Sequence, residues 1–297
     1  MRPARPADLL RQPECLRLRL PDGRETPAFL HRPEETRAMP VVYLHGIQSH
    51  PGWFFASAEK LAGRGHMVYQ PTRRGSGGSD TAPGHAASAE QLLDDVAAAC
   101  AEAQRVAGAT AVHVAGVSWG GKLAAAYAAR RECDGVASLT LIAPGIAPRV
   151  DVSITTKLSI ALSLLICPRR TFPIPLSDPA LFTASEPVQE YIRTDPSSLR
   201  RATARFFYTS RQLDRMLARA PDGAIRSPTT LMLASRDRIV DNAATRACVE
   251  RLTAGRAEVL QLPGAHTLEF EPDLRPLNDA LAAAIRRGEG AESPGVS

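Results

Sequence analysis

Residues 113–122 read HVAGVSWGGK, and this stretch decides the fold. Ser118 has Gly116 two residues before it and Gly120 two residues after it, between an apolar run typical of a buried strand and an alanine-rich run typical of a helix. In a G-x-S-x-G turn the serine takes a strained conformation that exposes its hydroxyl. The pattern predicts a nucleophilic serine, although such a turn can also bind phosphate or only allow close packing.

On both sides of this turn, apolar strands alternate with helical stretches. Strands that are apolar on both faces and alternate with helices indicate a mostly parallel sheet flanked by helices. Before them, 15–20 and 26–32 alternate apolar and polar residues, which predicts an antiparallel hairpin at the edge of the sheet. The expected strands are 41–46, 66–71, 109–116, 136–145, 229–235 and 257–263, and the expected helices are 53–64, 88–107 (with Ser88 as a cap), 120–130, 243–253 and 273–287.

The alternation stops after Pro144. Residues 146–226 contain eight prolines, amphipathic helical stretches and no convincing buried strand. We expect this segment to be a helical cap inserted into an α/β core that comprises 1–145 and 227–287. The last ten residues, 288–297, read GEGAESPGVS and predict a disordered tail.

Composition places the chain among soluble globular proteins. Its 44% hydrophobic and 23% charged residues are near the average for such domains. The longest apolar run, 158–167, is too short to cross a bilayer, and the N-terminal residues lack the apolar run of a secretory signal. We therefore expect a cytoplasmic protein. The five cysteines form no CxxC pair, which argues against disulfides and a zinc site.

The net charge of +5 is concentrated in one segment. Residues 146–226 carry 12 Lys or Arg and 7 Asp or Glu, whereas the rest of the chain carries 24 of each. Almost all of this excess is arginine, which suits bidentate contacts with phosphate or carboxylate. The segment is either a solvated helical face or a docking site for an acidic carrier protein or an anionic membrane surface. We expect no nucleic-acid partner.

An acyl-transfer serine needs a histidine base that is held by a carboxylate. Asp237 follows the expected strand 229–235, and His266 follows the expected strand 257–263. Because the carboxyl ends of parallel strands meet at one edge of a sheet, we expect both side chains near Ser118. The order Ser, Asp, His is that of α/β-fold hydrolases. A turn or capping role for Asp237 stays open, and Asp241 is its main competitor.

The loop HGIQSHPGW, residues 45–53, is the candidate for the rest of an oxyanion hole. Such a hole uses the backbone N–H after the nucleophile, here that of Trp119, and an N–H from an early loop, for which Ile47 is the best candidate. We expect His45 to shape this loop without titrating. His45 and His50 would make a poor metal site, because no cysteine or paired carboxylate accompanies them.

With these motifs the chain resembles the α/β-hydrolase superfamily, and within it the monoacylglycerol lipase, lysophospholipase and serine aminopeptidase-like group. The resemblance implies an eight-stranded, mostly parallel sheet, a helical cap over the serine, and acyl hydrolysis without a metal or an organic cofactor. The motifs that carry it are HG (45–46), RRGSGGS (73–79), GVSWGG (116–121), SRDRIVDN (235–242), GAH (264–266) and, in the cap, EPVQEYIRTDP (186–196).

Two positions depart from the group's pattern. Thr72 stands where the group often has Asp before its RGHG loop, and Ser76 stands where it has the loop histidine. The hydrogen bonds of this loop must therefore differ. RRGSGG could also suggest a phosphate cradle, but it lacks the Lys-Ser/Thr ending of a P-loop, so a packing turn is favoured.

These observations predict a serine hydrolase that cleaves a carboxylic ester of a monoacylglycerol, a lysophospholipid or a medium-chain acid. In the cap, Leu158 and Leu162 belong to an apolar helical face with Ile154, Leu165 and Ile166 that either lines an acyl tunnel or packs onto the body. Two alternatives stay open. One is a thioesterase or acyltransferase acting on acyl chains bound to acyl carrier protein or coenzyme A, and the other is a non-catalytic binding protein.

Overall fold

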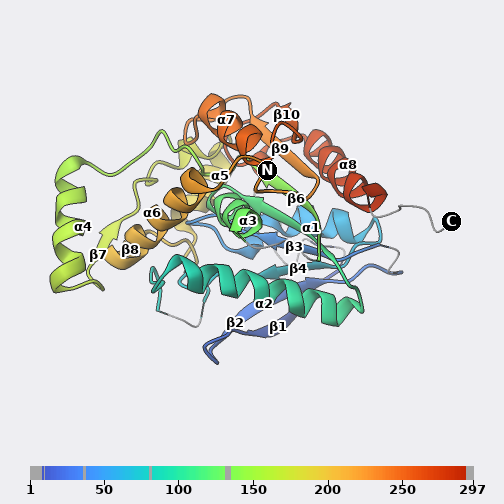
Figure 1. Cartoon of the computed structure of the whole chain (residues 1–297), viewed down its shortest axis with the longest axis horizontal. Helices are drawn as coiled ribbons and strands as arrows, with labels where there is room; N and C mark the ends of the chain where they lie inside the picture. Colours follow the sequence, from blue (N-terminus) through green and yellow to red (C-terminus); the bar gives the residue numbers. More distant parts are fainter. Residues whose placement is uncertain (1–8, 10, 36–37, 80–81, 131–134, 292–297) are drawn as a thin grey trace.

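An eight-stranded sheet forms the centre of the molecule (Figure 1). The computed structural model of the chain describes residues 9, 11–35, 38–79, 82–130 and 135–291. The strand order is β1-β2-β4-β3-β5-β6-β9-β10; β1 and β2 are antiparallel to each other, β2 is antiparallel to β4, and all other neighbours are parallel. This confirms the predicted fold class and the edge hairpin. The strands are Glu14–Arg19 (β1), Glu25–His31 (β2), Val41–Leu44 (β3), Val68–Pro71 (β4), Val112–Val117 (β5), Val136–Ile142 (β6), Thr229–Ala234 (β9) and Glu258–Leu262 (β10).

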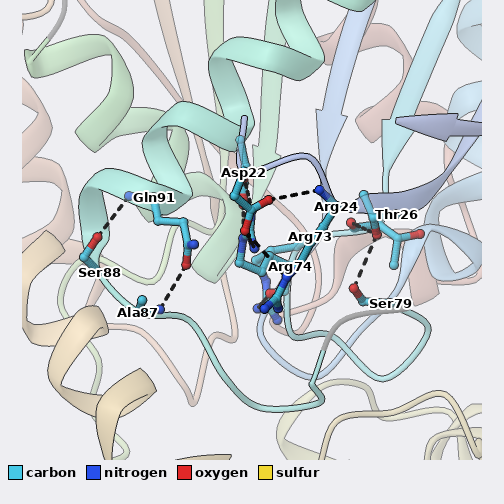
Figure 2. Close-up of polar contacts among 11 residues, drawn as sticks. Asp22, Arg24, Thr26, Arg73, Arg74, Ser79, Ala87, Ser88 and Gln91 are labelled. Atoms are coloured by element: carbon cyan, nitrogen blue, oxygen red, sulfur yellow. Dashed lines mark hydrogen bonds and ion pairs between the residues drawn. The ribbon is translucent and has the colours of Figure 1, made fainter. Parts of the chain in front are cut away.

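Helices flank the sheet, and their ends follow local sequence. Ser88 caps the longest of them, because its hydroxyl accepts the N–H of Gln91 at 3.1 Å (Figure 2). Helix α2 packs on α3, and α1 packs on α8. The helices of the core are Phe55–Ala62 (α1, after the 3₁₀ turn Pro51–Phe54, η2), Ala89–Ala107 (α2), Trp119–Arg130 (α3), Asn242–Leu252 (α7) and Arg275–Ala291 (α8), with the short turn Leu268–Phe270 (η4) before α8.

The C-terminal helix corrects one predicted boundary. Helix α8 continues to Ala291, so a tail that begins at residue 288 is wrong for 288–291, while 292–297 lie outside the described residues. Two glycines, Gly288 and Gly290, lie within this last part of the helix. The close approach of Gly288 to Ser138 on β6 explains why a glycine stands inside the helix.

Residues 146–226 lie to one side of the sheet, at the left of Figure 1. The expected helices are present, but the segment also contains an antiparallel pair, β7 with β8, that was not predicted. At three residues each, these strands are too short to show an alternating pattern. Its elements are Ile154–Ile166 (α4), Thr171–Pro173 (β7), Pro179–Leu181 (η3), Glu186–Thr194 (α5), Arg201–Thr203 (β8) and Ala204–Arg219 (α6).

The central strands bring distant residues together at their carboxyl ends. Every residue of β5, β6 and β9 is buried, as expected for parallel strands covered on both faces. The loops after β5, β9 and β10 carry Ser118, Asp237 and His266 to one edge of the sheet. Among the described residues, no helix is both long enough and apolar enough to span a membrane.

Candidate active site

Ser118 occupies a strained turn between β5 and α3. Its φ of 54° lies in the left-handed region, which residues other than glycine rarely adopt. A Cβ on Gly120 would lie 2.4 Å from the His45 carbonyl oxygen, and a Cβ on Gly116 would lie 2.6 Å from the Gly120 carbonyl oxygen. Only glycine therefore fits at these two positions, and the close approach of the helix to the strand holds Ser118 in the turn.

The three side chains expected to act together are joined by hydrogen bonds. His266 Nε2 lies 2.8 Å from Ser118 Oγ, and His266 Nδ1 lies 2.8 Å from Asp237 Oδ2. An ionised carboxylate can only accept, so Nδ1–H donates to Asp237 and Nε2 is left to accept the serine hydroxyl. The His266 side chain is 1% exposed and that of Asp237 is 0% exposed. This is the hydrogen-bonding arrangement that a serine nucleophile and its base require.

The structure distinguishes the two carboxylates, Asp237 and Asp241, that were candidates for holding His266. Asp237 Oδ1 accepts the backbone N–H groups of Ile239 and Val240 at 2.8 and 2.9 Å, which orients Oδ2 toward His266. Asp241 instead caps α7, where its side chain accepts the N–H of Ala244 at 3.0 Å. Asp241 is therefore a helix cap and makes no contact with the histidine.

The expected oxyanion loop lies directly against the serine. A Cβ on Gly46, just before Ile47, would be 3.4 Å from Ser118 Cβ. Within the described part of the chain, no protein acceptor takes the N–H of Ile47 or that of Trp119. The Trp119 N–H also opens helix α3, where the helix dipole favours negative charge. A role for these two amides in binding an oxyanion is compatible with this geometry and stays a prediction.

His45 and His50 have both ring nitrogens occupied by protein groups. His45 Nδ1 donates to the Gly46 carbonyl at 2.9 Å, and Nε2 accepts the Arg73 N–H at 3.0 Å. Burial, and then the charge of Arg73, hold the pKa of His45 well below its usual value, so the ring is neutral. His50 accepts the Gly52 N–H and lies 3.0 Å from Asp195. Neither ring presents a free nitrogen for a shared metal ion.

Arg73 is a functional candidate that sequence reasoning missed. Its guanidinium is buried, donates to the carbonyl oxygens of Ile47 and Arg74 at 2.9 Å, and lies 4.8 Å from the Trp119 ring. Among the described residues no carboxylate pairs with it. Burial lowers its pKa to about 9, which leaves it charged at pH 7. Together with its N–H bond to His45, Arg73 holds the first part of the candidate oxyanion loop. The position of Arg73 in the sequence, just before RGSGG, does not by itself indicate its contact with the loop at Ile47.

We expect the substitution Arg73→Met to lower kcat for a soluble ester about tenfold to a hundredfold with little change in KM. Complete loss of an oxyanion-hole donor costs about 10²–10³ in kcat, and loosening the loop that presents one should cost less. Arg73→Lys keeps the charge but not the fork between two carbonyls, so its loss should be intermediate. Steady-state kinetics and thermal unfolding, measured in parallel, separate this role from packing. A lower melting temperature with unchanged kcat would assign Arg73 to stability alone.

The loop 73–79 is a packing turn. A Cβ on Gly75 would lie 2.4 Å from the His85 carbonyl oxygen, and one on Gly77 would lie 2.3 Å from the Ser197 carbonyl oxygen. Protein backbone therefore occupies the space that a phosphate would need. Arg74 pairs with Asp22 (Figure 2) and with Asp95, at 2.8 and 2.7 Å. These ion pairs hold the loop in place.

The cap segment docks directly on the nucleophile turn. The Trp119 indole stacks on Phe206 of α6 with 5.3 Å between ring centroids, and its N–H donates to Ser210 at 2.9 Å. A second link joins Asp195, after α5, to the indole N–H of Trp53 at 2.8 Å and to the His50 ring. Burial opposes ionisation of Asp195, but the bonds from His50 and Trp53 outweigh it and lower its pKa to about 2. The cap is thus tied to both loops of the candidate site.

The apolar face of α4 is not where it was expected. Leu158 is 67% exposed and Leu162 is 58% exposed, so neither lines an enclosed acyl pocket nor packs onto the body. Both sequence-based interpretations of this face are wrong for this structure. The face is large, because three more of its side chains are at least as open: Ile154, Leu165 and Ile166, at 76%, 86% and 74%.

Sequence comparison places most of the chain in one family. The family model described as serine aminopeptidase, S33, matches residues 35–273. This range includes the serine turn and the loops of Asp237 and His266. No curated protein matches the chain.

The fold is similar to those of several solved lipases and esterases. A monoacylglycerol lipase from Paleococcus ferrophilus superposes with a TM-score of 0.78 at 20% identity, over 89% of this chain and 100% of that one. A soluble variant of monoglyceride lipase from Saccharomyces cerevisiae gives 0.79 at 16% identity, over 96% and 97%. A carboxyl esterase from Bacillus coagulans gives 0.75 at 14% identity, over 93% and 98%. At these identities the likeness establishes a shared fold.

Proposed function

The chain belongs to the serine aminopeptidase S33 family of α/β-hydrolases, and from this we propose that it is a serine hydrolase that cleaves carboxylic esters through an acyl-enzyme intermediate. The observation that carries the proposal is the unbroken chain of hydrogen bonds from Ser118 through His266 to Asp237. Hydrolysis of p-nitrophenyl esters, with covalent labelling of Ser118 by a fluorophosphonate, is its direct test.

In the first step Ser118 Oγ attacks the ester carbonyl carbon while His266 Nε2 takes the hydroxyl proton. The resulting imidazolium is stabilised by Asp237, whose second oxygen is held by two backbone amides. The carbonyl oxygen becomes an oxyanion, to which the N–H groups of Ile47 and Trp119 donate. His266 then gives its proton to the leaving alcohol.

In the second step water replaces the alcohol. His266 accepts a proton from this water, the hydroxide attacks the acyl carbon, and the proton returns to Ser118 Oγ as the carboxylic acid leaves. The same oxyanion donors serve both steps. None of these steps needs a group from outside the chain other than the ester and water.

For the substrate we propose a lipid ester, such as a monoacylglycerol, that the enzyme reaches at a lipid surface. The support is the exposed apolar face of α4, which water does not favour and which acyl chains would cover. Exposed cations lie next to it: Arg169 and Arg170 follow the helix, and Lys157, on the helix, pairs with Asp151. An exposed apolar face with basic residues beside it is suited to the surface of an anionic membrane.

An acidic carrier protein is the weaker alternative. Several arginines that would dock it already bond to groups of this chain. Arg200 donates to two backbone carbonyls, Arg201 donates to Thr171, and Arg211 pairs with Asp214 at 3.0 Å. Their capacity to bind a partner's carboxylates or phosphates is correspondingly smaller. A thioesterase acting on carrier-bound chains would lose activity steeply as salt increases.

The double substitution Leu158→Ser, Leu165→Ser should lower the hydrolysis of monoacylglycerol in vesicles by about tenfold or more. Burying one leucine is worth about 1.5–3 kcal/mol, so losing two weakens adsorption to the lipid even when each is only partly inserted. Hydrolysis of soluble p-nitrophenyl acetate should stay within about twofold, since the face lies outside the hydrogen-bonded triad. The two rates are measured on the same preparation.

The matched control is Thr155→Ser, an exposed polar position on the same helix. It should leave both rates unchanged. Equal losses on vesicles and on the soluble ester would mean that α4 supports the fold, and would remove the argument for a lipid surface. Unchanged vesicle hydrolysis in the double variant would do the same.

A further inference from the structure

A group of metal-binding side chains lies at the far end of the sheet from Ser118. His113 is the second residue of β5, and Ser118 follows the last. Five steps along the strand, from His113 to Ser118, span about 16 Å. His66, just before β4, and Glu289, near the end of α8, complete the group, and one ligand atom from each lies within 4.8 Å of the others. The cluster is therefore outside the candidate active site.

Both histidines are oriented as metal ligands usually are. His66 Nδ1 lies 3.1 Å from the Met39 carbonyl oxygen, so it carries the proton and leaves Nε2 with its lone pair. His113 Nδ1 bonds to Ser138 Oγ at 2.8 Å. Metal-binding histidines typically use one ring nitrogen for such a bond, which fixes the ring and directs the other nitrogen to the ion.

His113 Nε2 makes no hydrogen bond within the described part of the protein. The residue is 1% exposed, and this nitrogen has no hydrogen-bond partner there. A buried polar atom without a partner destabilises the folded state, because it loses its bonds to water and gains none in exchange. A bound cation would satisfy the nitrogen and the carboxylate together.

The helix that carries Glu289 is brought close to His113 by a glycine. A Cβ on Gly288 would lie 2.7 Å from Ser138 Cβ and 3.0 Å from His113 Cε1. Only glycine lets α8 approach the strands at this point. As a result Glu289 Oε1 lies 3.9 Å from His113 Nε2, although its side chain is still 32% exposed.

We propose that His66, His113 and Glu289 bind a divalent transition-metal ion, with zinc as the best fit. Two imidazole nitrogens and one carboxylate are ligands that zinc prefers, at about 2.0–2.2 Å each. Tetrahedral ligands at that distance are ~3.3 Å apart. The partly exposed Glu289 side chain reaches this spacing by rotating about its own bonds. The ion fastens the C-terminal helix to β5 and to the segment before β4, and water fills its fourth position.

The test uses untagged full-length protein stripped of metal with EDTA. It should bind one Co²⁺ per chain with visible d–d absorption, and Zn²⁺ should displace the cobalt and remove the band. Zn²⁺ should also raise the melting temperature. Glu289→Gln removes the charged ligand from a partly exposed position, and His66→Gln removes one imidazole; each should weaken binding at least tenfold and abolish the thermal shift.

Asp279→Asn is the matched control, because it neutralises an exposed carboxylate on the same helix. It should bind both ions like the unmodified protein. Wild-type affinity in both Glu289→Gln and His66→Gln would place any bound metal elsewhere and overturn the proposal, as would the absence of Co²⁺ and Zn²⁺ binding to the unmodified protein. Ester hydrolysis should be unchanged by EDTA and by Glu289→Gln, so the outcome is independent of the proposed function.

Discussion

Replacing Ser118 with Ala is expected to lower kcat for a soluble ester by on the order of 10⁶-fold. The substitution removes the oxygen that is placed to attack a carbonyl carbon while His266, at 2.8 Å, takes its proton. Because Ala keeps a Cβ in the same turn, the fold should not change. Stopped-flow and long-time-course hydrolysis of p-nitrophenyl butyrate would measure the loss, and melting temperature would verify the fold.

A fluorophosphonate probe gives the same result without a substrate. The unmodified protein should be labelled on Ser118, and Ser118→Ala should not be labelled at all. Ser177→Ala, in an exposed stretch of the cap segment, is the control and should be labelled normally. Wild-type turnover or labelling in Ser118→Ala would refute the assigned nucleophile, and the absence of both labelling and turnover in the unmodified protein would favour a binding protein.

Asp237→Asn is expected to lower kcat by about 10⁴-fold. The amide presents an N–H or an uncharged oxygen to His266 Nδ1, so it favours the wrong tautomer and no longer stabilises the imidazolium. The bonds from Ile239 and Val240 can persist to the remaining oxygen, which keeps the loop in place. Steady-state rates for one soluble ester give the comparison.

Asp241→Asn is a strict control for this substitution. Asp and Asn cap helices about equally well, so α7 should remain capped and the melting temperature should hardly change. Its kcat should stay within about twofold of the unmodified value. If Asp241→Asn were the variant that lost activity, the assignment of the acid would be reversed.

The core and the candidate triad were accessible from sequence for a physical reason. Strands buried on both faces are continuous apolar runs, and the residues that follow them must meet at one edge of the sheet. That is why Ser118, Asp237 and His266, far apart in the chain, could be grouped before their distances were known. Their hydrogen bonds, at 2.8 Å, follow from the topology and from the glycine-lined turn.

What could not be predicted depends on contacts between elements that have no sequence period. The apolar face of α4 has a helical pattern, but the pattern does not say whether protein or solvent covers it. The contact of Arg73 with Ile47 requires two loops to be placed side by side. Likewise, His66, His113 and Glu289 carry no ligand spacing along the chain, because three separate elements bring them together. The three-residue strands of β7 and β8 are too short to recognise.

The strained turn at Ser118 lowers the stability of the folded state. At φ 54° a glycine would be relaxed, whereas serine carries a conformational penalty of order 1 kcal/mol or more. Selection for folding alone would therefore favour glycine at this position over time. The hydroxyl in hydrogen-bond contact with a buried histidine is therefore held in this turn at a cost in folding stability.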